Sequence, residues 1–259
     1  MTTAARRFEG SVAVVTGAGS GLGTAAAERL AAEGATVALL DRDLRAVAEL
    51  ADELPHATAH EVDVTDAAAV DAVIDTVIDT VAARHGRIDA LVNNAGVVGP
   101  QVPVHETTDA IWSTVMRVNA DGAFHVLRAT LRAMVAGEGG AVVNMASSSG
   151  LSGKPNMAPY SFSKAGIVGL TRSAAIEYAA CGVRVNAVAP TAVRTPLVEQ
   201  HIQNAPDPSA MERLVTSQTP IPGLPTPADV AGVVAFLLSA EAAWITGLTV
   251  PVDGGYHAT

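Results

Sequence analysis

The 259-residue sequence contains few aromatic residues, a single cysteine and no long apolar run. Aromatic side chains make up 3% of the chain, so its core must be built mainly from Ala, Val, Leu and Ile. The one cysteine, Cys181, excludes an internal disulfide and fits a reducing compartment. Because no histidine is near it in the sequence, we interpret Cys181 as a small residue near the core rather than as a nucleophile.

Several kinds of partner are also disfavoured. The first ten residues, MTTAARRFEG, lack the apolar stretch of a signal peptide, and no apolar run approaches the ~18 residues of a membrane-spanning helix. We therefore expect a cytoplasmic protein with no membrane partner. A net charge of −10 would repel nucleic acid. His56 and His60 are four residues apart but have no third ligand nearby, so no metal site is expected.

Short apolar segments alternate along the chain with segments of helical periodicity. Helical spacing is found in residues 20–33, 67–84, 107–134 and 159–180. Strands are predicted at residues 11–17, 36–41, 56–64, 89–96, 140–147, 183–190 and 247–255. Such alternation predicts an α/β fold with a parallel sheet buried on both faces.

No linker divides the chain, so residues 1–259 are predicted to form one domain. The composition changes only at residues 191–227, where seven prolines fall between Pro196 and Pro227 and strand signals are few. A long insertion after a late strand is often functional, and we interpret this one as a substrate flap.

A glycine-rich segment, TGAGSGLG (residues 16–23), joins the first predicted strand to the first predicted helix. Glycines at such a turn let the backbone approach a pyrophosphate, and the amide groups and dipole of the helix favour the anion. The segment therefore predicts a dinucleotide site. Its candidate binding residues are Gly17, Ser20, Gly21, Leu22 and Gly23.

Asp41 ends the second predicted strand, 18 residues after Gly23. A carboxylate there can accept hydrogen bonds from the adenosine ribose hydroxyls and would repel a 2′-phosphate. The next residue, Arg42, could attract such a phosphate, but Ser20 supplies no second positive charge. The sequence thus favours NAD over NADP, with some use of NADP left open by Arg42.

Taken together, TGAGSGLG, NNAG at 93–96, Ser147 and YSFSK at 160–164 resemble the short-chain dehydrogenase/reductase family. The resemblance implies a three-layer Rossmann-type fold, with a seven-stranded parallel sheet flanked by helices, and a homotetramer. Its implied catalytic residues are Asn119, Ser147, Tyr160 and Lys164.

The resemblance also implies most of the remaining cofactor contacts. Asp63 and Val64 would lie near the adenine, and Pro190, Val193 and Thr195 near the nicotinamide. Asn93, Ala95 and Gly96 would lie under the nucleotide, although NNAG could also serve packing at the end of the sheet. One departure is Thr191, where the family usually has glycine, because Thr191 disfavours a positive φ and alters the expected substrate pocket.

Tyr160 and Lys164 are four residues apart in a predicted helix and therefore share a face. A nearby ammonium stabilises phenolate, so we expect Lys164 to lower the pKa of Tyr160 by ~1–3 units and make it an acid/base. Both residues would also contact the cofactor, Lys164 at the nicotinamide ribose. By the resemblance, Ser147 would donate a hydrogen bond to the substrate oxygen, and Asn119 would position a water linking Lys164 to solvent.

The predicted reaction is interconversion of a secondary alcohol and a ketone. The substrate is expected to be neutral, apolar and perhaps cyclic, because few of the candidate pocket residues are charged: Val97, Val98, Ser149, Met157, Thr191 and Leu197. One alternative is a 3-oxoacyl-[acyl-carrier-protein] reductase, which the net negative charge and Asp41 disfavour. Another is a non-catalytic nucleotide sensor, which the complete catalytic set disfavours.

Overall fold

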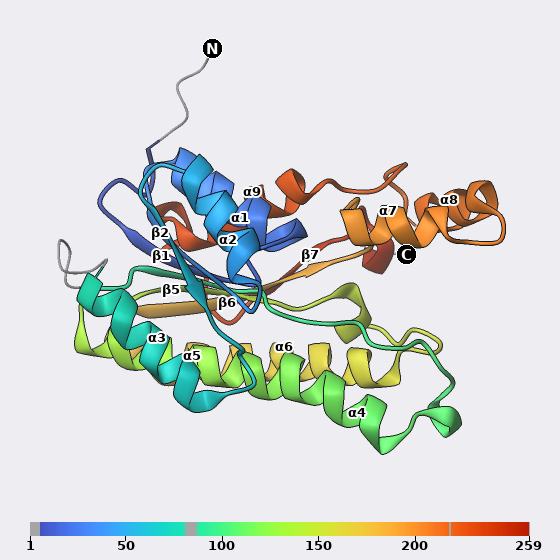
Figure 1. The fold of residues 1–259 in the computed structure, drawn as a ribbon, viewed down its shortest axis with the longest axis horizontal. Helices are drawn as coiled ribbons and strands as arrows, with labels where there is room; N and C mark the ends of the chain where they lie inside the picture. Colours follow the sequence, from blue (N-terminus) through green and yellow to red (C-terminus); the bar gives the residue numbers. More distant parts are fainter. Residues whose placement is uncertain (1–5, 81–86, 218, 259) are drawn as a thin grey trace, which may run out of the picture.

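The computed structural model describes residues 6–80, 87–217 and 219–258. In these residues the chain forms one seven-stranded sheet with all strands parallel, in the order β3-β2-β1-β4-β5-β6-β7 (Figure 1). The predicted strands are confirmed in number and sequence order. Their bounds are β1 Val12–Thr16, β2 Thr36–Asp41, β3 Ala57–Glu61, β4 Ala90–Asn93, β5 Gly140–Met145, β6 Val183–Pro190 and β7 Thr249–Val252.

Helices cover both faces of the sheet, which gives the three layers implied by the resemblance (Figure 1). One layer contains α1 Gly21–Ala32, α2 Leu44–Glu53 and α9 Pro227–Leu238. The opposite layer contains α3 Ala67–Thr80, α4 Asp109–Met116, α5 Ala123–Ala136 and α6 Ala158–Tyr178. The end of the predicted helix 67–84 lies outside the described residues.

The core is aliphatic and lies on both sides of the sheet. All five residues of β1 are buried, which explains why this strand reads as a continuous apolar run. On one face, the sheet packs against Leu30 of α1 and Val234 of α9. On the other face, it packs against Ile74 of α3 and Leu127 of α5. The residue alternation along each strand therefore supplies two separate apolar layers.

The strand order reverses direction between β1 and β4. In open parallel sheets, ligands bind in the crevice at the carboxyl ends of the strands at such a point. The loops that leave these strand ends here carry Gly17 after β1, Asn94 after β4 and Ser147 after β5. The topology therefore brings the glycine-rich segment, NNAG and Ser147 to one edge of the sheet.

The helical region 107–134 differs from the single α-helix that was predicted. It consists of α4, a π-helical turn (Arg117–Gly122) and α5. A π-turn is wider than an α-helical turn, and such turns are frequently found at functional sites. Apolar periodicity does not reveal the extra width, because the flanking helices keep their apolar faces toward the sheet.

The proline-rich segment 191–227 contains two short helices, α7 Pro196–Gln203 and α8 Pro208–Thr216 (Figure 1). Pro196 and Pro208 each stand in the first turn of these helices, and Pro227 does so in α9. Proline is favoured there because the first-turn amide has no intrahelical partner. The prolines therefore mark helix starts rather than an irregular loop.

Cys181, expected near the core, is exposed in the 3₁₀ turn Ala179–Cys181 after α6, so that interpretation was wrong. The turn ends at Gly182, whose positive φ lets the chain reverse into β6 at the surface.

In the described part of the chain, no helix has the length and hydropathy needed to cross a bilayer.

Candidate active site

The glycine-rich segment forms a tight turn between β1 and α1. Gly17 and Gly21 have φ values of +62° and +57°, which favour glycine. A Cβ on Gly23 would collide with the carbonyl oxygen of Gly17, so the helix starts against the turn only because residue 23 is glycine. Ser20 is the N-cap residue, but its side chain makes no capping hydrogen bond, and no acidic residue stands in the first turn of α1. The first amide groups of α1 are thus left for an anion, which fits a pyrophosphate.

Asn94, which the sequence analysis did not single out, fixes this turn. Its side-chain amide donates to the carbonyl oxygens of Thr16 (3.0 Å) and Gly17 (3.1 Å). The hydroxyl of Thr16 in turn accepts from the backbone amides of Asn94 (2.9 Å) and Ala95 (3.1 Å). These bonds join the ends of β1 and β4 at the reversal of strand order. The doubled asparagine of NNAG was the available signal, and strand alternation could have assigned the two residues to opposite faces.

Asn93 has a packing role within the protein. It is 4% exposed, and its side-chain amide donates to the carbonyl oxygen of Ala123 (2.9 Å) and to Oδ1 of Asn144 (3.0 Å). Asn144 donates to Thr171 of α6 (3.0 Å), so a buried polar chain links β4, β5 and α6. Both donor hydrogens of Asn93 are therefore used inside the protein, as the packing interpretation of NNAG expected.

Asp41 lies directly beside the glycine-rich turn. Its Oδ2 accepts from the backbone amide of Gly19 (3.0 Å), and its Oδ1 accepts from the amide of Asp43 (3.0 Å). The carboxylate is therefore held in a defined position at the end of β2, where a ribose is expected. Arg42, the following residue, is exposed.

Asp63 and Val64 lie just after β3, the strand that pairs with β2. Hydrogen bonds from Thr65, chiefly from its backbone amide, lower the pKa of Asp63, and the charges of Arg42 and Arg117 lower it further. Arg42 thus acts on Asp63 as well as standing next to Asp41. Val64 is buried, and a Cβ on Gly122 would come within 2.6 Å of its Cγ2.

Tyr160 stands in the first turn of α6, one turn before Lys164. The Nζ of Lys164 lies 5.8 Å from the centroid of the Tyr160 ring. Ser147, at the start of the loop that joins β5 to α6, forms a hydrogen bond with the phenol. The structure therefore brings together three of the four predicted catalytic side chains.

We expected the pKa of Tyr160 to be lowered, and this was wrong for the protein without bound cofactor. Burial raises the pKa of Tyr160, and the hydrogen bond with Ser147 opposes that shift. The ammonium of Lys164 lies near the ring and donates to the carbonyl oxygen of Met145 (2.7 Å). The i, i+4 spacing correctly predicted a shared face, but burial of the phenol could not be derived from spacing.

Lys164 is itself a strongly perturbed group. It is 4% exposed, and burial lowers its pKa from 10.5 to about 8. Glycine at position 96 leaves room for the Lys164 side chain. A Cβ on residue 96 would lie 3.4 Å from Nζ of Lys164 and 3.2 Å from Oδ1 of Asn119. Lys164 and Asn119 therefore approach the same point of the backbone after β4.

Asn119, in the π-turn, holds the backbone at Val97. Its Oδ1 accepts from the amide of Val97 (2.8 Å), and its Nδ2 donates to the carbonyl oxygen of Val97 (2.8 Å) and to Oγ of Ser163 (3.0 Å). The fourth predicted catalytic residue thus lies next to Lys164. Its observed contacts fix the loop after β4 and the start of α6.

The predicted nicotinamide segment follows β6. Thr195 caps α7, since its side chain accepts from the amide of Val198 (3.4 Å). Its Cγ2 would be 3.5 Å from a Cβ on Gly21, so this segment lies across from the glycine-rich turn. Val193 is buried, and Pro190 pairs with Val252 of β7. Of the described non-glycine residues only His56 and Asn156 have a positive φ, so Thr191 fits without that strain.

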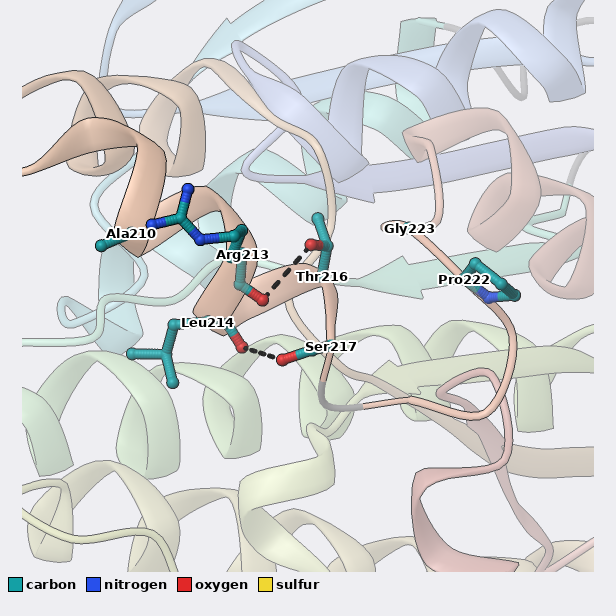
Figure 2. A pocket seen from close by; sticks show the side chains of 7 residues that line it. All are labelled: Ala210, Arg213, Leu214, Thr216, Ser217, Pro222 and Gly223. Atoms are coloured by element: carbon teal, nitrogen blue, oxygen red, sulfur yellow. Dashed lines mark hydrogen bonds between the residues drawn. The ribbon is translucent and has the colours of Figure 1, made fainter.

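A hollow of about 590 Å³ lies in the proline-rich segment, between α8 and the chain that returns from it (Figure 2). None of the candidate catalytic residues lines it. Its lining residues are Ala210, Arg213, Leu214, Thr216, Ser217, Pro222 and Gly223. The described residues contain no group of histidine, cysteine and acidic side chains that could hold a metal ion.

Comparisons with known proteins agree with this geometry. Residues 17–257 match a family model described as enoyl-(acyl carrier protein) reductase. The chain is 42% identical to cis-4-hydroxycyclohexanecarboxylate dehydrogenase of Sinomonas cyclohexanicum, covering 97% of this chain and 98% of the relative.

Two crystal structures have the same fold as this chain. That of levodione reductase matches with a TM-score of 0.88 at 39% identity, covering 98% of this chain and all of that one. That of NAD⁺-bound xylitol dehydrogenase matches with a TM-score of 0.89 at 35% identity, covering 96% of this chain and all of that one. The chain therefore belongs to the short-chain dehydrogenase/reductase family and is an oxidoreductase that interconverts alcohols and ketones.

Proposed function

We propose that this enzyme uses NAD(H) to interconvert a secondary alcohol and a ketone, with Tyr160 as the acid/base. The observation that carries the proposal is the grouping of a half-buried phenol, the Ser147 hydroxyl and the buried ammonium of Lys164. Groups of perturbed pKa gathered at the carboxyl edge of a parallel sheet are typical of a catalytic site.

The cofactor, when bound, supplies the hydride acceptor in oxidation and the hydride donor in reduction. The phenol of Tyr160 takes the hydroxyl proton of the alcohol in oxidation and returns it to the oxygen in reduction. The hydroxyl of Ser147 donates a hydrogen bond to the substrate oxygen as negative charge develops. Lys164 holds a positive charge near the phenol, and Asn119 fixes the backbone at Val97 beside it.

The geometry of the protein fits NAD. The uncapped start of α1 fits the pyrophosphate, and the carboxylate of Asp41 fits the ribose hydroxyls. Lys164 fits the nicotinamide ribose. The remaining proposed contacts are Gly17, Ser20, Gly21, Leu22, Gly23, Arg42, Asp63, Val64, Asn93, Ala95, Gly96, Tyr160, Pro190, Val193 and Thr195. For Asn93 the contact is through the backbone, since its side chain is used internally.

We expect kcat/KM to be about 100-fold higher with NAD than with NADP, because Asp41 would repel the 2′-phosphate. Replacing Asp41 by serine should reduce this preference at least about tenfold, mainly by raising KM for NAD. Steady-state kinetics with both cofactors would measure the ratio. Asp43→Ser is a matched control, since Asp43 caps α2 two residues away. Equal kcat/KM values for the two cofactors in the wild type would contradict the assignment.

The reacting part of the substrate is proposed to be apolar and cyclic. Several residues around the predicted pocket, including Val97, Val98 and Met157, are apolar. One of the relatives is named for its action on cis-4-hydroxycyclohexanecarboxylate, a cyclic secondary alcohol. Fold and family define the reaction class, whereas the pocket defines the substrate.

The reaction is tested by following nicotinamide absorbance with NAD and a set of cyclic secondary alcohols, and with NADH and the matching ketones. We expect turnover with cyclohexanols and little with a carrier-tethered 3-oxoacyl thioester, because a chain of net charge −10 would repel an acidic carrier protein. Preference for the tethered thioester would favour the reductase alternative. Cofactor binding without turnover of any alcohol or ketone would favour a nucleotide sensor.

We also propose that the chain acts as one domain in a homotetramer in the cytoplasm, with residues 191–227 as its substrate flap. Apolar side chains at the surface of the helices support assembly. Trp112 of α4 and Phe162 of α6 pack against each other with ring centroids 5.1 Å apart, and both are exposed, as is Ile176 of α6. Exposed apolar groups of this size commonly mark contacts between subunits.

A further inference from the structure

The chain contains only two lysines, Lys154 and Lys164, among its 16 basic residues. Both lie in the segment that runs from the loop after β5 into α6. The proposed mechanism uses Lys164 and leaves Lys154 without a function. Lys154 stands between Ser147 and Tyr160, on the loop that joins the two catalytic side chains.

Lys154 is half-buried and has no carboxylate partner among the described residues. Its Nζ lies 5.4 Å from the centroid of the Tyr256 ring. Burial lowers the pKa of Lys154, and no neighbouring negative charge opposes that effect. By contrast, buried Glu33 is paired with both Arg7 and Arg29. A partly desolvated ammonium that lies beside an aromatic ring and has no carboxylate partner among the described residues is costly unless an anion joins it.

The loop that carries Lys154 is held in place by the end of the chain. Nε2 of His257 lies 3.1 Å from Oγ of Ser152, and Nδ1 of His257 lies 2.6 Å from Oδ2 of Asp253. Asp253 is buried and also accepts from the backbone amides of Gly255 and His257. Lys154, two residues after Ser152, is therefore positioned by the fixed loop and by Tyr256.

This terminal segment leaves the sheet next to the proposed nicotinamide site. β7 pairs with β6 as far as Pro190 and Val252, and the amide of Thr191 donates to the carbonyl oxygen of Val252 (3.3 Å). The flap reaches the same place, since the amide of Ile221 donates to the carbonyl oxygen of Gly254 (3.0 Å). Lys154 therefore lies where the loop between Ser147 and Tyr160 meets a terminal segment that also contacts the flap.

We propose that Lys154 binds a carboxylate of the substrate that is remote from the carbinol carbon. This inference rests on the proposed function and refines its substrate to a cyclic alcohol or ketone that bears one carboxylate. A single ammonium suits a carboxylate, whereas a phosphate is usually bound by several cationic or amide donors. Because the chain has a net charge of −10, an anionic substrate needs such a local cation to enter the site.

The kinetic test compares cis-4-hydroxycyclohexanecarboxylate with cyclohexanol. In Lys154→Met, kcat/KM for the carboxylate should fall about 10- to 100-fold, mainly through KM, while kcat/KM for cyclohexanol stays within about twofold. Lys154→Arg should restore most of the loss because it keeps the charge. Equal losses for the two substrates would overturn the inference and leave Lys154 a structural residue.

A binding test separates this inference from the proposed reaction. Reductive ¹³C-methylation labels Lys154, Lys164 and the terminal amine only and keeps the charge of each lysine. Unreactive cyclohexanecarboxylate, titrated into the NADH complex, should shift the Lys154 signal saturably, and cyclohexanol and inorganic phosphate should not. If wild type oxidises no alcohol, the proposed function fails, yet this shift would still support the carboxylate site. No shift, or an equal shift with phosphate, would overturn it.

Discussion

Replacing Tyr160 by phenylalanine is expected to lower kcat about a thousandfold and leave NAD affinity within about twofold of the wild type. The substitution removes one oxygen, so the half-buried ring still fits in its place near Ser147 and Lys164. What is lost is the group that exchanges a proton with the substrate oxygen. Stopped-flow or steady-state kinetics would measure kcat, and fluorescence or calorimetric titration would measure NAD binding.

Tyr178→Phe provides a matched control, because Tyr178 lies at the other end of the same helix and only partly packs against the core. It should leave kcat unchanged within about twofold. If Tyr160→Phe kept more than a tenth of the wild-type kcat, the phenol would not be the acid/base. Another group would then have to be found near Ser147.

Replacing Lys164 by methionine is expected to lower kcat/KM by about 100-fold or more. The charge that favours phenolate would be lost, while burial would still raise the pKa of Tyr160. The remaining activity should therefore move to higher pH. A pH profile of kcat/KM would measure this shift, which a purely structural effect would not produce.

The same substitution should also change how stability depends on pH. An unfolded lysine keeps its proton up to about pH 10.4, whereas folded Lys164 releases it above about 8. Between these values the unfolded state binds more protons, so the free energy of unfolding of the wild type should rise with pH, by up to about 3 kcal/mol. In Lys164→Met this contribution should disappear.

Urea unfolding at several pH values between 7.5 and 10.5 would measure this difference. Lys154→Met is the natural control, because it removes the only other lysine and leaves Lys164 in place. It should keep most of the rise in stability with pH. If wild type and Lys164→Met showed parallel curves over this range, Lys164 would not be buried as a charged group.

The sheet was predictable from the sequence because most of its strands are short apolar runs that alternate with segments of helical periodicity. The glycine-rich turn, Asp41 and the Tyr160–Lys164 pair were predictable for a related reason, since their spacing along strand and helix fixes their location. The family resemblance supplied Ser147 and Asn119, and the structure places Ser147 beside Tyr160 and Asn119 near Lys164.

Other features depend on tertiary contacts that leave no periodic signal. The side chain of Asn94 bonds to residues 77 and 78 positions earlier, which only the pairing of β1 with β4 brings close. The raised pKa of Tyr160 depends on burial of the phenol in the folded chain. The position of Lys154 depends on contacts between its loop and Tyr256 and His257, about 100 residues further along the chain.

The π-helical turn at Arg117–Gly122 affects how this chain should be aligned with others. Such a turn accommodates one residue more than a regular helical turn, and it does so without changing which sides of α4 and α5 meet the sheet. A one-residue gap at this point would therefore not be a harmless length difference. It would identify a homologue whose helix runs on regularly at the turn that carries Asn119, the residue that here bonds both the amide and the carbonyl of Val97.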